Sequence, residues 1–372
     1  MDNKIDSCVN PEFSRRIVAL RFVLTCCVVF THAHLREIST VDGVMELAEP
    51  TWTKAIRVTF AQILGRIAVP TFFIISGYLF FAKRKPFFQT LQSKFRSLFL
   101  PYVLWTVFTI ILYYFVQLFE FSSPYFSNPE SLIANWGVRE YLSAFWEIES
   151  KGEHSGMPLV FQFWYVRNLM VMFVISPIIK LFAQRCPLAY FVFISFLMLM
   201  SNIGLFEDYN GWVTALFYFS LGYYAVNHID TIIKIVDSIK MSDFLIAYAI
   251  PFMLSICAYF RVIKGGSLIL WLNWLFAILL AVKLAGWAAT KEKLYDKLSY
   301  LAGFSFWIYA AHAPFLIKVL NKLGAKLLPM TGGWFLVHFF GVFFISVGVL
   351  LALGILLKRF LPRFYALFCG GR

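Results

Sequence analysis

Charged and titratable side chains inside long apolar runs are the places where this sequence can carry out chemistry. A charge among apolar residues is costly, so it usually faces a cavity or a partner. Arg21 and His32 lie in the first such run, with ten residues between them. In a helix this spacing puts both side chains on one face, about 16 Å apart along the axis. The pair suits a pocket with a cation at its mouth and a proton acceptor deeper inside. The alternative is an Arg21 that snorkels to the membrane surface and a His32 at the interface.

Two later apolar runs each carry one more candidate. Arg66 stands in the second run, where we expect it to be buried, and Pro70 removes a backbone donor four residues further on. Ser76-Gly77 in the same run indicates close packing of a neighbouring helix. His312 lies in a run near the C-terminus, at mid-membrane to outer depth, and a histidine at such a depth is a functional candidate.

Further cations stand at the ends of apolar runs. Lys94 and Arg96 precede the third run, where they can bind phosphates or simply set the topology of the chain. Trp164 and Tyr165 open the fourth run and suit the aromatic belt at a membrane surface. Arg167 follows just inside that belt, where it can reach an anionic or hydroxylated ligand.

The amino-acid composition indicates whether these side chains belong to a soluble protein or to a membrane protein. Of the 372 residues, 60% are hydrophobic and only 14% are charged, which is too few charges to coat a soluble protein of this size. The net charge of +13 does not indicate nucleic-acid binding, because the basic residues lie mainly in short segments between apolar runs. The sequence therefore predicts an all-α integral membrane protein in contact with membrane lipid.

We expect about ten transmembrane helices in one polytopic domain covering residues 1–372. The candidate segments are residues 16–35, 58–82, 97–119, 160–183, 187–205, 211–227, 243–262, 267–288, 300–321 and 333–357. Lys and Arg concentrate in alternate loops, which predicts that both termini are cytoplasmic, with a C-terminal tail over about 358–372. The loop over about 120–160 is then outside, and residues 131–148 within it are either an interfacial helix or a solvated connector.

Several classes of site have no motif here. The sequence contains no GxSxG, Walker A, HExxH or GxGxxG pattern. The six cysteines form no CxxC pair, so we expect neither a disulfide framework nor a metal site. Asp and Glu fall almost entirely in loops, which argues against an ion-coupled transporter with paired membrane carboxylates.

Five short motifs in order make this chain resemble the membrane-bound acyltransferase family 3, whose members O-acylate bacterial surface glycans. The motifs are the Arg-x10-His pair Arg21 and His32, "VPxFFxISGY" at Val69 to Tyr78, "KxRxLxxPY" at Lys94 to Tyr102, "WYxR" at Trp164 to Arg167, and "SFxIYxxH" at Ser305 to His312. Each motif is short, but all five occur in the expected order on the expected runs. The resemblance covers nearly the whole chain and is to the stand-alone form without an added extracytoplasmic domain.

The resemblance implies an enzyme of the bacterial inner membrane that moves an acyl group, usually acetyl, from cytoplasmic acyl-coenzyme A. The group goes to a hydroxyl of a polymeric or lipid-linked sugar, and no cofactor is bound permanently. The implied roles are a base (His32), a second histidine that orients it or belongs to the acceptor site (His312), oxyanion stabilisation (Arg66 or Arg167), donor binding (Arg21, Lys94 and Arg96) and contact with the acceptor or oxyanion (Trp164, Tyr165, Arg167 and Tyr309). Direct transfer and an acyl-histidine relay both remain open.

Two other function classes compete with this one. A ten-span bundle with buried Arg and His would also suit an exporter of a glycan or an acylated intermediate. A membrane sensor or scaffold without activity is the third reading, but it leaves Arg21, His32, Arg66 and His312 unexplained. Turnover of acyl-coenzyme A by the purified protein separates the first class from the other two.

Overall fold

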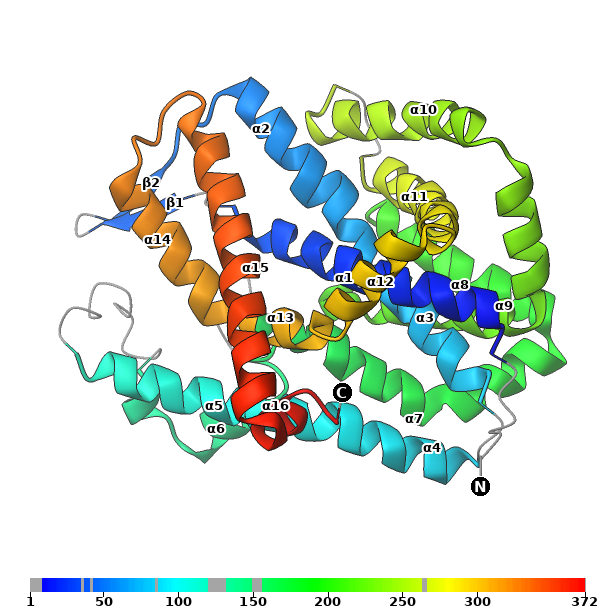
Figure 1. The fold of residues 1–372 in the computed structure, drawn as a ribbon, viewed down its shortest axis with the longest axis horizontal. Helices are drawn as coiled ribbons and strands as arrows, with labels where there is room; N and C mark the ends of the chain where they lie inside the picture. The colour runs from blue at the N-terminus through cyan, green and yellow to red at the C-terminus, as the bar shows by residue number, and fades with distance from the viewer. Residues whose placement is uncertain are drawn as a thin grey trace. The chain divides into compact units, whose positions relative to one another are not determined.

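The computed structural model describes residues 9–34, 37–40, 43–83, 86–119, 132–148, 156–262 and 266–371. The chain divides into two compact units. Unit 1 consists of Met1–Thr31, Val58–Ser93 and Asn168–Ser305, and unit 2 consists of His32–Arg57, Lys94–Arg167 and Phe306–Arg372. Each unit is therefore built from segments far apart in the sequence (Figure 1).

Unit 1 is built from helices whose apolar lengths match the runs in the sequence. Its elements are α1 (Pro11–His32, whose last residue belongs to unit 2), the π-helical turn η1 (Thr59–Leu64), the 3-10 turn η2 (Gly65–Ile67), α3 (Ala68–Phe81), α4 (Phe87–Lys94), α7 (Trp164–Arg185, from Asn168 onward), α8 (Pro187–Asn202), the 3-10 turn η8 (Tyr209–Gly211), α9 (Trp212–Ser238), α10 (Met241–Tyr259), α11 (Gly266–Ala289) and α12 (Glu292–Ala302).

Helices α3 and α9 of unit 1 cross with their backbones in close approach. A Cβ atom added to Gly77 would overlap the backbone carbonyl of Phe219, and one added to Gly222 would overlap that of Ile74. Only glycine leaves room for two helices at this separation. The interpretation of Ser76-Gly77 as a packing motif is thus supported at Gly77.

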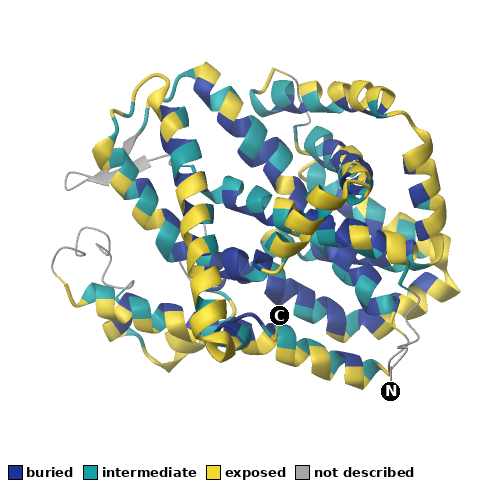
Figure 2. Ribbon diagram, in the orientation of Figure 1, coloured by how far each residue is buried: buried dark blue, intermediate teal, exposed yellow. Residues whose placement is uncertain are grey.

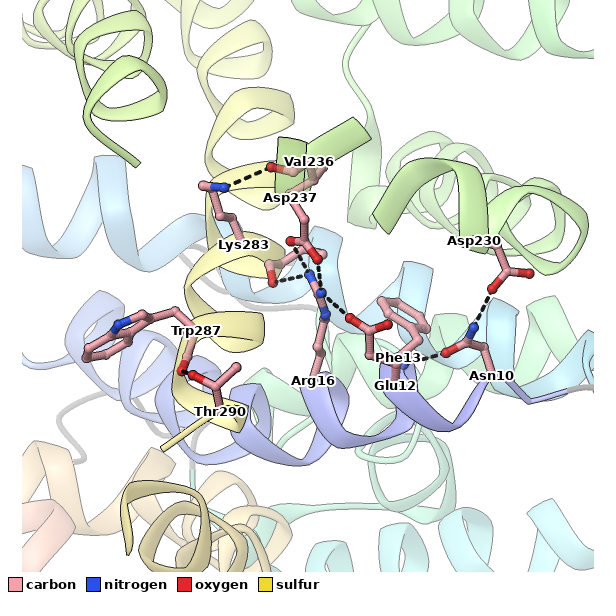
Figure 3. A network of polar contacts seen from close by, with 11 residues as sticks. Asn10, Glu12, Phe13, Arg16, Asp230, Val236, Asp237, Lys283, Trp287 and Thr290 are labelled. Carbon is pink, nitrogen blue, oxygen red and sulfur yellow. Dashed lines mark hydrogen bonds and ion pairs between the residues drawn. The ribbon is translucent and has the colours of Figure 1, made fainter. Parts of the chain in front are cut away.

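A buried cation ties three helices of unit 1 together at one end (Figure 3). The Arg16 side chain of α1 is only 2% exposed, and its guanidinium pairs with the carboxylates of Asp237 on α9 and Glu12 on α1. It also donates a hydrogen bond of 3.3 Å to the carbonyl of Val282 on α11. Arg16 is therefore a structural ion-pair centre of unit 1.

Removing one carboxylate from this network should destabilise the fold. Asp237→Asn keeps the shape of the side chain but removes the charge that compensates buried Arg16, so we expect the free energy of unfolding to fall by about 1–3 kcal/mol. Denaturant unfolding of the purified protein in detergent measures the change. Asp243→Asn, which alters an exposed carboxylate on α10, is the control and should change it by less than about 0.5 kcal/mol. Equal effects of the two variants would contradict the structural role.

Unit 2 is also helical, apart from one small sheet. Its elements are β1 (Glu37–Thr40), β2 (Gly43–Glu46), α2 (Thr51–Val58, as far as Arg57), the π-helical turn η3 (Phe95–Phe99), α5 (Leu100–Gln117), the 3-10 turn η6 (Ile133–Asn135), α6 (Val138–Ser143), the 3-10 turn η7 (Phe161–Phe163), α13 (Ser305–Ala311, from Phe306 onward), the π-helical turn η9 (His312–Leu316), α14 (Ile317–Leu327), α15 (Trp334–Phe360) and α16 (Pro362–Phe368).

The C-terminal segment of unit 2 folds back onto α5. The Trp105 indole donates a hydrogen bond of 3.0 Å to the carbonyl of Phe368 at the end of α16. Gly370 has a φ of 69°, and a Cβ there would overlap the carbonyl of Ser97 in η3. Residues 358–371 are thus mostly helical and packed, and they lie at the end of α5 that also carries Arg96. The cytoplasmic position of this segment stays a prediction.

The described helices suit a multi-pass membrane protein. Six helical segments are long and apolar enough to cross a membrane, and the bent pair of Glu292–Ala302 with Ser305–Leu327 would make a seventh. Exposed residues lie along these helices, α15 among them (Figure 2). They include large apolar side chains such as Phe344, which is 65% exposed. An apolar surface of this kind is stable in lipid and costly in water.

Each of the ten apolar segments expected from the sequence coincides with a helix or a short series of helices. The helical class is confirmed, with the antiparallel pair β1–β2 as an addition to an otherwise helical described part. The count of ten crossings and the cytoplasmic position of both termini stay predictions. In the expected outer loop, residues 132–148 contain η6 and the short helix α6, whereas residues 120–131 and 149–155 lie outside the described residues.

Candidate active site

Two histidines 280 positions apart in the chain meet in unit 2. His32 is the last residue of α1, and His312 begins the turn η9 after α13. Their ring centroids are 5.5 Å apart, and the His32 ring also meets the edge of Phe161 at 4.9 Å. His312 is fully buried and His32 is half-buried. The last residues of two separate sequence motifs therefore form one histidine pair.

The helix that carries His312 is broken at that residue. Ala313 has an extended backbone (φ −134°, ψ 161°), and Pro314 has no N–H group to donate. Carbonyl groups of the preceding turn therefore need other donors. The Nδ1 atom of His312 lies 2.7 Å from the Tyr309 carbonyl and 3.2 Å from the Ile308 carbonyl.

This contact defines the tautomer of His312. Carbonyl oxygens only accept hydrogen bonds, so the hydrogen of the neutral ring must be on Nδ1. The lone pair is then on Nε2, which is buried and has no hydrogen-bond partner among the described residues. An imidazole held in one tautomer by its Nδ1 hydrogen bond has the arrangement of a general base.

Gln162, on the turn η7, supplies the other donors that the broken helix needs. Its Nε2 atom donates a hydrogen bond of 3.0 Å to the carbonyl of Ala310 and another to that of Ala313. In the opposite direction, the Tyr309 hydroxyl donates to the backbone carbonyl of Gln162. These bonds hold the two segments together around His312 and use the hydrogen of the Tyr309 hydroxyl.

Aromatic rings line the same region of unit 2. Phe163 lies between Tyr102 and Tyr309, with ring centroids 5.3 and 5.9 Å away and nearly parallel planes. Tyr165 meets Tyr309 edge-on at 6.2 Å. Tyr165 and Tyr309, both expected near the acceptor, are therefore brought together with the His312 turn, and Trp164 begins α7 beside them in sequence.

Arg167 is buried and hydrogen-bonded to backbone. It is 1% exposed, and its Nη1 donates to the carbonyl of Trp146 at 2.6 Å and to that of Gly156 at 3.2 Å. Its guanidinium also lies over the Trp146 ring, 5.4 Å from the centroid. Arg167 thus fastens the chain on either side of residues 149–155. Its assignment as an oxyanion-stabilising group stays a prediction.

The other predicted cations occupy different places. Lys94 is half-buried and Arg96 is exposed, and both lie before α5 in unit 2. Arg21 is exposed on α1 in unit 1, and α1 is continuous from Arg21 to His32, as the spacing requires.

The expectation that Arg66 is buried is wrong. The side chain is exposed, whereas its neighbours Gly65 and Ile67 are buried. A π-helical turn ends at Leu64, and Arg66 lies in the 3-10 turn that follows it. The number of residues per turn here therefore differs from that of an α-helix. Depth within an apolar run therefore does not predict which face of the helix Arg66 occupies.

Comparison with known proteins decides the family. A model described as an acyltransferase domain matches residues 15–358. The chain belongs to acyltransferase family 3. It is also similar to the succinoglycan biosynthesis protein ExoH of Rhizobium meliloti (strain 1021), with 26% identity over 98% of this chain and 94% of that protein. No solved structure matches.

Membership of acyltransferase family 3 gives the histidine pair a chemical role. Acyl transfer to a hydroxyl needs a base, because a neutral hydroxyl is a weak nucleophile. The Nε2 atom of His312 has no hydrogen-bond partner among the described residues and lies on a ring beside His32, so it is suited to accept a hydrogen bond from His32 when that ring takes the proton.

Sequence reasoning missed Gln162, which the structure places at the centre of this site. Its signal was present, because it is a polar residue in the apolar run Val160 to Phe163, next to the "WYxR" motif. A polar residue at such a position must find partners inside the protein. Which partners it finds depends on the break at Pro314, far away in the sequence.

Proposed function

We propose that this protein is an O-acyltransferase of the bacterial inner membrane. It transfers an acyl group, acetyl in the simplest case, from cytoplasmic acyl-coenzyme A to a hydroxyl of a cell-surface glycan or a lipid-linked sugar. The observation that carries the proposal is the His32–His312 pair, in which the Nε2 atom of His312 is buried and has no hydrogen-bond partner among the described residues. Membership of the acyltransferase family supports the reaction class, and similarity to a protein of succinoglycan biosynthesis supports a glycan acceptor.

The reaction follows from the roles of the two rings. The acceptor hydroxyl oxygen attacks the thioester carbonyl carbon while His32 takes the hydroxyl proton. His312 Nε2 stabilises the resulting imidazolium by accepting a hydrogen bond from it. The C–S bond then breaks, and the coenzyme A thiolate leaves with the proton returned by the histidine pair. Arg66 and Arg167 are the candidate groups for the negative charge that develops on the carbonyl oxygen.

Turnover by the purified full chain in lipid nanodiscs tests the reaction. Acetyl-coenzyme A is the donor probe and methyl β-D-glucoside and methyl β-D-galactoside are the acceptor probes. Thiol release that depends on a glycoside, together with an acetylated product in the mass spectrum, is the expected result. An exporter or a scaffold would give neither, and that outcome would overturn the proposal. Mass spectrometry of surface glycans from cells with and without the gene then identifies the natural acceptor.

Donor binding is assigned to cations on the cytoplasmic side, with Lys94 and Arg96 foremost and Arg21 third. Coenzyme A carries several phosphate charges, and each charged contact is worth about 1.5–3 kcal/mol. The double change Lys94→Ala with Arg96→Ala should therefore raise KM for acetyl-coenzyme A by at least about tenfold and affect kcat less. Lys180→Ala with Arg185→Ala, at the end of α7, is a matched removal of two basic residues and should leave KM unchanged. An unchanged KM in the first variant would restrict Lys94 and Arg96 to setting topology.

A further inference from the structure

The orientation of the Gln162 amide is determined by its neighbours. Gln162 is 2% exposed, and its nearest hydrogen-bond partners are the carbonyl oxygens of Ala310 and Ala313. Because those oxygens only accept, the NH2 end of the amide must face the broken turn. The Oε1 atom is then directed away from the two carbonyls. It is buried and has no hydrogen-bond partner among the described residues.

The two carbonyls that Gln162 binds lie on either side of His312 in the chain. Gln162 donates to both of these carbonyl oxygens at the point where Pro314, which has no N–H group, interrupts the helix. The Tyr309 hydroxyl completes the connection by donating to the Gln162 backbone. The backbone on both sides of the His312 ring is therefore fixed from outside its own helix, and Gln162 provides most of that support.

Two acceptor atoms in this region have no hydrogen-bond donor among the described residues. They are the Oε1 of Gln162 and the Nε2 of His312, and both are buried. A buried acceptor without a donor costs about 1–3 kcal/mol, so two of them, on the neighbouring turns η7 and η9, mark a place where donors arrive from a ligand or from water. Neutral acceptors suit hydroxyl groups and disfavour an anion, whose oxygens would face them without a hydrogen between. A sugar, which presents several hydroxyls on neighbouring carbons, has the required chemistry.

We propose that Gln162 is a positioning residue of this acyltransferase and part of its acceptor subsite. Its NH2 group holds the turn that aims His312, and its Oε1 accepts a hydrogen bond from a second hydroxyl of the sugar. The nucleophilic hydroxyl lies at the histidine pair. The inference rests on the proposed function, because it assumes a hydroxylated acceptor at this site.

The test compares purified Gln162→Met, Gln162→Glu and Thr106→Val with wild type, using acetyl-coenzyme A and the two methyl glycosides. Gln162→Met keeps the length of the side chain but loses both its donor and its acceptor. We expect kcat to fall about 10–100-fold, because a small displacement of a catalytic group greatly slows the reaction. KM for the glycoside should rise about tenfold, corresponding to one lost hydrogen bond, and KM for acetyl-coenzyme A should stay within about twofold.

Gln162→Glu gives a second readout through its pH profile. A carboxyl group buried beside two carbonyl oxygens stays protonated and donates one O–H, so activity should be intermediate between those of wild type and Gln162→Met. As pH rises through the pKa of that carboxyl, the ionised form repels both carbonyls. The alkaline decline in kcat should therefore begin at lower pH than in wild type. If Gln162 contributed only to general stability, the alkaline decline in kcat would begin at the same pH as in wild type.

Thr106→Val controls for loss of a buried polar contact elsewhere in unit 2. Thr106 is fully buried and donates only to the Tyr102 carbonyl within its own helix, so its kinetic constants should stay near wild type. Normal kcat and glycoside KM in folded Gln162→Met would overturn the inference alone. The inference would also be overturned if the losses in kcat and in affinity for the glycoside only matched the loss of folded protein, measured by thermal unfolding, as in Thr106→Val. A wild-type protein inactive with both glycosides would overturn the proposed function and the inference together.

Discussion

Replacing His32 with alanine is expected to reduce acyl transfer by about 10²–10⁴-fold, with the protein still folded and inserted. The imidazole lies 5.5 Å from that of His312 and is the proposed acceptor of the hydroxyl proton. His32→Gln should be nearly as inactive, because an amide keeps size and hydrogen bonding but has no basic nitrogen. The measurement is glycoside-dependent thiol release from acetyl-coenzyme A, normalised to the amount of folded membrane protein.

The neighbouring residue supplies the control for this experiment. His34 is two positions further along the chain, beyond the end of α1, so His34→Ala perturbs the same stretch without removing the proposed base. We expect its activity to stay within a few-fold of wild type. An active His32→Ala together with an inactive His34→Ala would show that the Arg-x10-His register is wrong, and the assignment of the base would be lost with it.

Replacing His312 with asparagine is expected to have an effect of similar size, about 10²–10⁴-fold on kcat. The asparagine amide nitrogen takes a position close to that of Nδ1, so it can still donate to the Tyr309 carbonyl. What this variant loses is Nε2, the buried atom without a partner among the described residues. A large loss of activity in a normally stable protein therefore assigns the chemistry to Nε2.

His312→Ala separates the structural part of this role from the chemical part. Alanine removes Nε2 and also the ring N–H that donates to the Tyr309 and Ile308 carbonyls, so it should destabilise the protein by about 1–3 kcal/mol more than asparagine does. Both variants should be inactive, but only His312→Ala should unfold at lower denaturant concentration. Full activity in His312→Asn would reduce the ring to a backbone support and leave His32 as the base without its partner.

The pair of histidines illustrates where prediction from the sequence ends. Their motifs named both residues separately, and the ten-residue spacing placed Arg21 and His32 on one continuous helix, as α1 confirms. The contact between His32 and His312 joins residues 280 positions apart. The local hydrophobic periodicity of the sequence cannot predict this contact, because the contact depends on which helices pack together in unit 2. The same holds for Gln162, whose partners exist only because Pro314 breaks a distant helix.

The arginines show even more clearly that the burial of a side chain depends on the tertiary structure. Arg16 stands at the start of the first expected apolar segment, residues 16–35, and it is buried against Asp237 of α9. Arg66 was expected to be buried, yet it is exposed. Arg167 was assigned to a ligand, which stays a prediction, and the structure adds that its Nη1 atom donates to two backbone carbonyls. An arginine has a long side chain with five donors, so its partners are chosen by the tertiary structure around it.

The sequence by itself determined the helical membrane class, the positions of the apolar helices and membership of the acyltransferase family. These properties depend on run length, composition and short ordered motifs, all of which are local in the chain. Only the tertiary structure decided that His32 meets His312, that Gln162 supports the broken turn, and that residues 358–371 pack on α5. Each of these depends on satisfying buried polar groups across separate helices, and a donor can be matched to its acceptor only when the packing of those helices is known.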